Sequence, residues 1–290
     1  MLRILEEDEF DKYIDFAYEL ATDPAKSGYP TYADGIKTKE RFVKRARKAF
    51  ERDEEDILLF EKDDSVKGWI HYCHLEDDNY AGTYAFCIEE GMEEAIDEFT
   101  ELVQSQYPAC ELYLGFSKKN AEAINEFKKL GFECIEESYN DILDFRKYDV
   151  RSDNSHVIRI CADNYELFSD IHSQHDDSDM YWTSQRIKEA LDKWCIFVYL
   201  QDDKTIGAIY FMISDDKTVD EIFGIDFLSE NYDSEVFKVL LTSVLNYEKN
   251  RGVEYMIFFN DEETQKDTCE CGFKCIDEYV CLKNKGEDVL

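Results

Sequence analysis

Apolar residues recur along the chain in two similar series of predicted elements. A short strand at 2–4 precedes a helix whose apolar side chains recur every three or four residues from Phe10 to Ala17. A second short strand at 158–160 precedes a similar helix from Tyr165 to Ile171. The two halves of the chain therefore begin in the same order, strand and then amphipathic helix.

The matching order continues to the end of each half. The further matched pairs are second helices at 38–52 and 184–193, hairpins at 56–75 and 195–214, long helices at 92–106 and 233–250, and strands at 110–116 and 254–259. Asp63-Asp64 and Asp202-Asp203 are the predicted hairpin turns.

A repeated phrase closes both series and indicates one domain built twice. GFECIEE at 131–137 aligns with GFKCIDE at 272–278. The polar stretch YDVRSDNSH, which includes residues 148–155, is typical of a linker. We therefore predict an N-terminal domain at 1–147, a linker at 148–155 and a C-terminal domain at 156–290.

Composition and charge limit the function classes. The chain has 33 Lys and Arg against 67 Asp and Glu, a formal net charge of −34, and 44% hydrophobic residues. The apolar share is sufficient for folded cores. A negative field repels phosphate backbones, so we predict no nucleic-acid partner, and it attracts cations.

We expect a cytoplasmic protein with no membrane partner and no bound metal. The start, MLRILEEDEF, lacks the apolar core of a signal peptide, and runs such as WCIFVYL at 194–200 are too short to cross a bilayer. Cysteines in that compartment stay reduced. Cys269, Cys271, Cys275 and Cys281 suggest a zinc site, but apolar strand packing explains them as well. His172 and His175 are expected in a loop.

The order of elements resembles that of the GNAT superfamily of acyl-CoA-dependent N-acyltransferases, in two tandem copies. The most specific segment is Asn120-x-x-Ala123-x-x-x-Phe127-x-x-x-Gly131-Phe132, which matches the family pattern N-x-x-A-x-x-x-Y-x-x-x-G-F in spacing. The resemblance implies an α/β fold of the α+β type, with two acyltransferase-like domains. Each would be a mixed, mostly antiparallel sheet flanked by helices.

The resemblance also implies acetyl-CoA as co-substrate, with its pantetheine arm between two strands that diverge. These strands would be 83–88 with 110–116, and 220–226 with 254–259. We expect at most one half to bind acetyl-CoA tightly, and the surviving Gly91, Asn120 and Ala123 favour the first. The implied cofactor-binding residues are Cys87, Ile88, Gly91, Met92, Asn120, Ala123 and Phe127.

Two departures from the family pattern bear on activity. The loops expected to bind pyrophosphate, EEGMEE at 89–94 and SENYDSEVF at 229–237, carry carboxylates that would repel it. The tyrosine that often protonates the leaving thiolate is replaced by Phe127, and in the second half Thr268 falls nearest to its place. Tyr113 and Tyr139 are alternative donors.

Four residues are the catalytic candidates. The resemblance places a base on the strand before the long helix, where the second half has Glu221 and Asp226 and the first has Glu89 near the end of the strand. Tyr113 is the candidate acid. In an acidic chain most carboxylates are solvated surface charges. A solvated surface charge is therefore the alternative interpretation of Glu221, Asp226 and Glu89.

Two function classes remain open from the sequence. One is an acetyl-CoA-dependent N-acetyltransferase acting on a small primary amine, and the other is a catalytically degenerate tandem module that only binds. The loop at 24–35 carries Tyr29 and Tyr32, and the loop at 172–182 sets Asp176, Asp177 and Asp179 beside Tyr181 and Trp182, which favours a cationic acceptor. The sequence does not distinguish a monomer from an oligomer.

A basic helix is predicted at 37–52 in this acidic chain. Phe42, Ala46, Ala49 and Phe50 form its apolar stripe, so the basic side chains are expected on its other faces. They would either pair with surrounding acids or form a docking surface for the acidic second half of the chain or for an anionic ligand.

Overall fold

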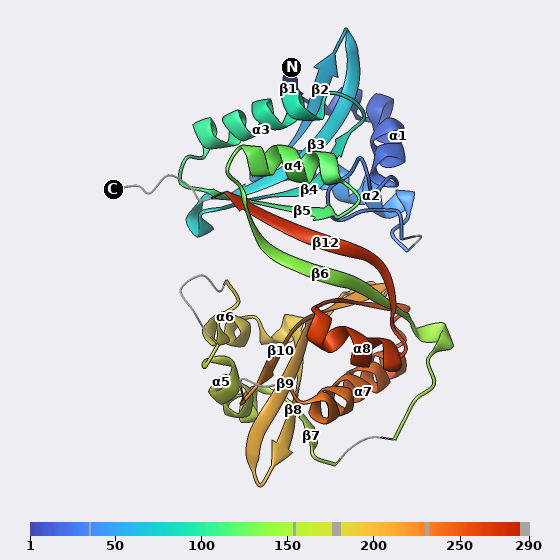
Figure 1. Ribbon diagram of the computed structural model, residues 1–290, viewed down its shortest axis with the longest axis vertical. Coiled ribbons are helices and arrows are strands. Elements are labelled where there is room, and N and C mark those ends of the chain that lie inside the picture. The colour runs from blue at the N-terminus through green and yellow to red at the C-terminus, as the bar shows by residue number, and fades with distance from the viewer. Residues whose placement is uncertain (35, 153–154, 176–180, 230–231, 285–290) are drawn as a thin grey trace. The chain divides into compact units, whose positions relative to one another are not determined.

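The computed structural model divides into two compact units, which we call unit 1 and unit 2 (Figure 1). It describes residues 1–34, 36–152, 155–175, 181–229 and 232–284. Unit 1 contains 1–137 and 277–290, and unit 2 contains 138–276. In the described ranges, no helix is both long and apolar enough to span a membrane.

Unit 1 is a mixed sheet with helices on both faces. Its strand order is β1-β2-β3-β4-β5-β12, where β4 and β5 are parallel and the other neighbours are antiparallel. Its elements are β1 (Leu2–Ile4), α1 (Phe10–Ala21), α2 (Lys39–Arg47), β2 (Glu55–Lys62), β3 (Ser65–Leu75), β4 (Tyr80–Ile88), α3 (Met92–Gln106), β5 (Glu111–Ser117), α4 (Ala121–Lys129) and β12 (Lys274–Asn284).

Alternation along the strands gives unit 1 two cores. Phe86 and Ile88 of β4 pack with Phe99 of α3 and Phe127 of α4 on one face of the sheet. Cys87, between them in sequence, packs on the other face with the residues of α1 and α2. Burial of these apolar faces on both sides of the sheet is the main stabilising term.

Unit 2 repeats this architecture. Its strand order is β7-β8-β9-β10-β11-β6, with β10 and β11 parallel and the other neighbours antiparallel. Phe168 of α5 lies in the core of one face, and Phe237 of α7 in the other. Its elements are β6 (Glu133–Asp144), β7 (Val157–Arg159), α5 (Glu166–His172), α6 (Ser184–Glu189), β8 (Trp194–Gln201), β9 (Lys204–Met212), β10 (Val219–Phe227), α7 (Ser234–Arg251), β11 (Tyr255–Asn260) and α8 (Glu262–Glu270).

The last strand of each repeat completes the sheet of the other unit. β12 pairs with β5 of unit 1, from Tyr279 opposite Ser117 to Asn284 opposite Leu112. β6 pairs with β11 of unit 2, from Tyr139 opposite Asn260 to Asp144 opposite Tyr255. The compact units therefore differ from the repeat boundaries expected at 1–147, 148–155 and 156–290, because backbone pairing and not sequence order assigns these strands.

The two acidic hairpin turns lie where they were predicted, and their residues have a left-handed backbone conformation. Asp63 and Asp64 have φ of +51° and +58°, and Asp202 and Asp203 have +50° and +61°. Two consecutive left-handed residues match the twist of the flanking strands, and aspartate tolerates this region better than most residues do. The second of these positions still favours glycine.

We predict that Asp203→Gly stabilises unit 2 by about 0.5–1 kcal/mol, because it relieves a left-handed residue in a type I′ turn. Urea unfolding measures the change. The control is Lys204→Gly, one residue later at the start of β9, which should lower the unfolding free energy instead. A loss of stability in Asp203→Gly would contradict the turn assignment.

Candidate active site

In both units, two parallel strands begin as partners and then diverge. β4 and β5 pair at residues 80–82 and 111–113, although β4 continues to Ile88 and β5 to Ser117. β10 and β11 pair at 219–222 and 255–258, and β10 continues to Phe227. We call the unpaired ends of each strand pair the unit 1 fork and the unit 2 fork. Backbone groups facing a fork need partners other than the neighbouring strand.

The unit 1 fork contains a segment of the chain itself, Lys26–Tyr29. Its backbone forms antiparallel bridges to both strands, Ser27 to Cys87 of β4 and Gly28 to Phe116 of β5. The amide of Gly28 donates to the carbonyl of Phe86 at 2.6 Å, and the amide of Ile88 donates to the carbonyl of Lys26 at 2.9 Å. The amide of Tyr29 donates to the carbonyl of Gly115 at 2.7 Å. The segment therefore lies between the two strands as a short additional strand.

Asn120, a predicted cofactor-binding residue, holds this segment in place. Its side chain is fully buried, and Nδ2 donates to the carbonyl of Ser27 at 3.2 Å. Its Oδ1 accepts from the amide of Ala123 at 3.2 Å, which caps α4. Both ends of the carboxamide are thus used within unit 1.

The other predicted cofactor-binding residues have structural positions in unit 1. Cys87 and Ile88 contact the inserted segment through their backbones, as described above. Gly91 precedes α3 with φ of +80°, a conformation in which other residues are strained. Met92, Ala123 and Phe127 are buried in the core. Their assignment to acetyl-CoA stays a prediction, and the occupied fork counts against the first half as its site.

Glu89 and Tyr113 also form local contacts in unit 1. Glu89 is exposed and pairs with Lys67 at 3.0 Å. The hydroxyl of Tyr113 donates to Glu111 at 2.8 Å, and burial raises the pKa of Tyr113 above its usual value. A higher pKa makes the phenol a weaker proton donor, so this environment does not favour Tyr113 as the catalytic acid.

A buried ionic cluster, which the sequence analysis did not predict, lies on the α1 and α2 side of unit 1. Glu55 is 5% exposed and accepts from Arg45 at 2.7 and 2.8 Å, from Arg52 at 2.7 Å and from His71 at 2.9 Å. Burial alone would raise the pKa of Glu55, but the hydrogen bonds from His71, Arg45 and Arg52 outweigh it and hold that pKa below its usual range. The Arg45 guanidinium also stacks on Tyr84 at 3.5 Å. Of the two alternatives for the basic helix, pairing with surrounding acids is the one that Arg45 shows, at a half-buried position.

The unit 2 fork presents the same backbone groups in the same register. Ile88 faces Gly68 across the sheet, and Phe227 faces Gly207 at the matching place. The carbonyl of Ile225 and the amide of Phe227 therefore correspond to the two β4 groups that bind the inserted segment. Among the described residues, the loop contact on this edge is His175, whose Nε2 lies 3.1 Å from the carbonyl of Phe227. Residues 176–180, in the matching loop, lie outside the described residues.

Asp226, a predicted base, is buried against a histidine. Its Oδ2 lies 2.7 Å from Nδ1 of His172, and Nε2 of the same ring lies 2.9 Å from the carbonyl of Trp182. A ring that faces two acceptors is satisfied as an imidazolium, which donates from both nitrogens. His172 is the last residue of α5 and is fully buried, so the expectation of a loop histidine is wrong. The pair connects β10 with α5 and the chain that follows it.

Glu221, the second predicted base, lies beside an aromatic surface. It is opposite Met212 of β9, and Met212 is opposite Trp194 of β8, so the three share one face of the sheet. Trp194 contacts Phe223 with ring centroids 5.3 Å apart. Phe223 is 46% exposed at a bulge of β10, two residues after Glu221. Glu221 itself is half-buried.

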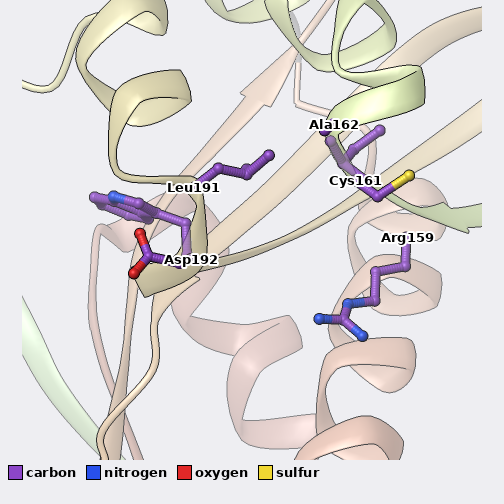
Figure 2. A pocket seen from close by; sticks show the side chains of 7 residues that line it. Arg159, Cys161, Ala162, Leu191 and Asp192 are labelled. Carbon is purple, nitrogen blue, oxygen red and sulfur yellow. The ribbon is translucent and has the colours of Figure 1, made fainter.

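A shallow pocket of about 400 Å³ has Trp194 in its lining. Charged side chains of opposite sign, Arg159 and Asp192, contribute to its lining (Figure 2). The Arg159 guanidinium also lies 4.7 Å from the ring centre of Tyr247.

The start of α7, where the resemblance implies pyrophosphate binding, is already capped. The side chain of Asp233 accepts from the amides of Glu235 and Val236, at 3.1 Å each. These are among the amides that a phosphate would otherwise use. Glu230, predicted to oppose phosphate here, lies outside the described residues. The capping carboxylate agrees with the acidic character noted in the sequence.

Solved structures share the architecture of this chain. A GCN5-related N-acetyltransferase from Sphaerobacter thermophilus has a TM-score of 0.67 at 10% identity, covering 98% of this chain and 95% of that one. A tandem GNAT protein from the clavulanic acid biosynthesis pathway has a TM-score of 0.58 at 11% identity, covering 100% of both chains. A glucosamine N-acetyltransferase region of a fungal multi-domain GH3 β-N-acetylglucosaminidase has 0.64 at 12% identity, over 98% of this chain and 38% of that one. No family model and no curated protein matches the sequence.

The class of protein is thus a tandem α+β protein with diverging parallel strands in each unit. More specifically, the chain has the fold of the GNAT acetyltransferases, in two copies, as the sequence resemblance predicts. Identities near 10% establish the fold, and the activity has to be argued from the residues of this chain.

We predict that Asp226→Asn lowers the unfolding free energy by about 1–3 kcal/mol, because it removes the carboxylate that binds the buried ring of His172. Urea unfolding at neutral pH measures this loss. Asp192→Asn, at an exposed site, is the control and should change stability by less than about 0.5 kcal/mol. An unchanged unfolding free energy in Asp226→Asn would contradict a structural role and return Asp226 to the list of bases.

Proposed function

We propose that the chain is an acetyl-CoA-dependent N-acetyltransferase that acts on a small cationic primary amine, with its reacting site in unit 2. The observation that carries this proposal is the edge of β10 at the unit 2 fork. The carbonyl of Ile225 and the amide of Phe227 face a strand that has diverged, and no described backbone pairs with them. Such groups, inside a sheet, call for a ligand with matching amides.

Unit 1 supplies an internal template for that ligand. There, one backbone amide and one backbone carbonyl of Lys26–Tyr29 satisfy the equivalent groups of Phe86 and Ile88. The pantetheine arm of acetyl-CoA also carries secondary amides, so it can offer the same donor and acceptor to Ile225 and Phe227. When bound, acetyl-CoA supplies the activated acetyl thioester.

Glu221 is the residue that we assign as general base. A primary amine is protonated at neutral pH and has to lose a proton before its nitrogen can attack. Asp226 is engaged with His172, whereas Glu221 lies on the same sheet face as Trp194 and next to the bulge at Phe223. Its carboxylate can accept the ammonium proton there, and positioning of the amine lowers the remaining barrier.

The aromatic surface supports a cationic acceptor. Phe223 is 46% exposed and contacts Trp194 with ring centroids 5.3 Å apart, and the ring of Trp182 also contacts Trp194, at 5.2 Å. Exposed aromatic faces attract ammonium groups by about 0.5–2 kcal/mol. The net charge of −34 adds long-range attraction for cations. Asp176, Asp177 and Asp179, which motivated this acceptor class, lie outside the described residues.

A second function, a tandem module that binds without catalysis, is favoured by one observation. Asp233 occupies the amides at the start of α7, so the diphosphate of a coenzyme would lack its usual anchor in unit 2. Acetyl-CoA would then bind through its pantetheine arm alone, and weakly. Turnover with an amine distinguishes this module from an enzyme.

The test is a panel of primary amines with acetyl-CoA, with free thiol measured as product. We expect polyamines and other polycationic amines to react, and neutral or anionic amines to react far less. Rates should fall with added salt, because the attraction is screened over ~10 Å at 0.1 M. No turnover with any amine would overturn the enzyme proposal in favour of the binding module.

Glu221→Gln isolates the proposed base. We predict a fall in kcat of about 10²–10⁴-fold, with acetyl-CoA affinity unchanged, because the carboxylate acts on the acceptor and not on the coenzyme. Asp215→Asn, at an exposed position before β10, is the matched control and should retain full activity. Full activity in Glu221→Gln would remove Glu221 from the mechanism.

A further inference from the structure

The segment Lys26–Tyr29 satisfies the polar groups that a ligand would need in unit 1. Phe86 and Ile88 of β4, Gly115 of β5 and Asn120 at the start of α4 each share a hydrogen bond with it. These four bonds come from both strands of the fork and from the helix that follows. A pantetheine arm can reach the same groups only if the segment leaves.

The fit of the segment is close and depends on glycine. A Cβ placed on Gly28 would lie 3.1 Å from Cβ of Phe86 and 3.2 Å from the carbonyl oxygen of Gly115. Ser27, next to it, is fully buried, and its hydroxyl donates to the carbonyl of Asp23 at 2.8 Å. Because Ser27 is small and Gly28 has no side chain, the backbone of this segment fits between β4 and β5.

The second repeat does not carry this sequence. Residues 173–183, which follow α5 as 22–38 follow α1, read SQHDDSDMYWT and contain no glycine and three aspartates. Carboxylates are costly to bury between two strands without a cation beside them. The sequence of this loop therefore lacks the Ser-Gly pair that the close insertion in unit 1 uses.

We propose that Lys26–Tyr29 is a built-in occupant of the unit 1 fork, which closes unit 1 to acyl-CoA and leaves unit 2 as the binding unit. The part that concerns unit 2 rests on the proposed function. Because the segment belongs to the same chain, its effective concentration at the fork is on the order of millimolar or more. A coenzyme at micromolar concentration would have to bind these groups about a thousandfold more tightly than the segment does in order to displace it.

The bridge between Ser27 and Cys87 allows the closed state to be locked. Backbone hydrogen bonds join the residues on either side of this pair, but none joins Ser27 directly to Cys87. In such antiparallel pairs the Cα atoms lie ~4.5 Å apart, within the range of a disulfide. Ser27→Cys therefore places a second thiol opposite the free thiol of Cys87. Burial raises the pKa of Cys87 to about 12, so an added oxidant and a long incubation are needed.

We expect Ser27→Cys to form this disulfide in the folded protein, as detected by peptide mapping. The oxidised protein should bind acetyl-CoA and turn over amine within about twofold of the reduced protein, because unit 1 is closed in both. The control is Ser27→Cys with Cys87→Ala, which cannot form the bond. Any change that this double variant shows on oxidation comes from the other cysteines and not from the bond between residues 27 and 87.

Two results would overturn the inference. The disulfide fails to form under native conditions although Ser27→Cys folds, or oxidation abolishes acetyl-CoA binding and reduction restores it. Amide exchange gives a second measure: the amides of Gly28, Tyr29 and Ile88 should stay protected with and without acetyl-CoA. Loss of protection at Gly28 on adding acetyl-CoA would mean that the segment is displaced.

Failure of the proposed function is distinguishable from failure of this inference. If acetyl-CoA does not bind at all, the acetyltransferase proposal fails. Disulfide formation and amide protection still report whether unit 1 is closed, because neither measurement depends on a ligand.

Discussion

The structure depends on a constraint at the point where two parallel strands diverge inside a sheet. Backbone groups on the diverging edges are buried in the sheet but have lost their neighbouring strand, and leaving them unpaired costs about 1–3 kcal/mol each. Unit 1 meets the constraint with its own residues Lys26–Tyr29. In unit 2 the matching groups at Ile225 and Phe227 have no described backbone partner, and this difference separates two copies of one fold.

The other differences between the units agree with this division. Where unit 2 presents Trp194, Phe223 and the half-buried Glu221 on one face, unit 1 has the Arg45–Glu55 ion pair beneath Tyr84. Unit 1 is thus filled both at its fork and on the sheet face where an acceptor would enter. A closed copy serves stability, whereas unit 2 keeps backbone groups at Ile225 and Phe227 that no described backbone pairs with, as ligand sites do.

The order of elements could be predicted because it depends on local patterns. Periodicity and the repeated Gly131–Glu137 phrase gave the helices and strands, and the acidic turns at Asp63 and Asp202 have the left-handed backbone typical of tight hairpins. The pairing of β12 with β5 was not predictable, since backbone hydrogen bonds between residues far apart in sequence leave no periodic signal. Insertion of Gly28 between β4 and β5 is hidden for the same reason.

The candidate site was predicted in part. Asn120 was selected from its motif and proves to bind the carbonyl of Ser27, so the residue was found but a coenzyme was expected where the chain itself lies. Asp226 and Glu221 were equal candidates in sequence, and the structure places Asp226 against the buried ring of His172 and Glu221 on the sheet face of Trp194. Pairing of Arg45 with an acid was among the expectations, but the partner was not predicted, because a basic residue in an amphipathic pattern gives no sign of a buried carboxylate such as Glu55.

Calorimetric titration of the intact chain with acetyl-CoA tests the central claim, that one copy is closed and the other is open. The account predicts saturation at one acetyl-CoA per chain. Two sites of similar affinity would contradict the closure of unit 1, and no heat at any concentration would contradict the opening of unit 2.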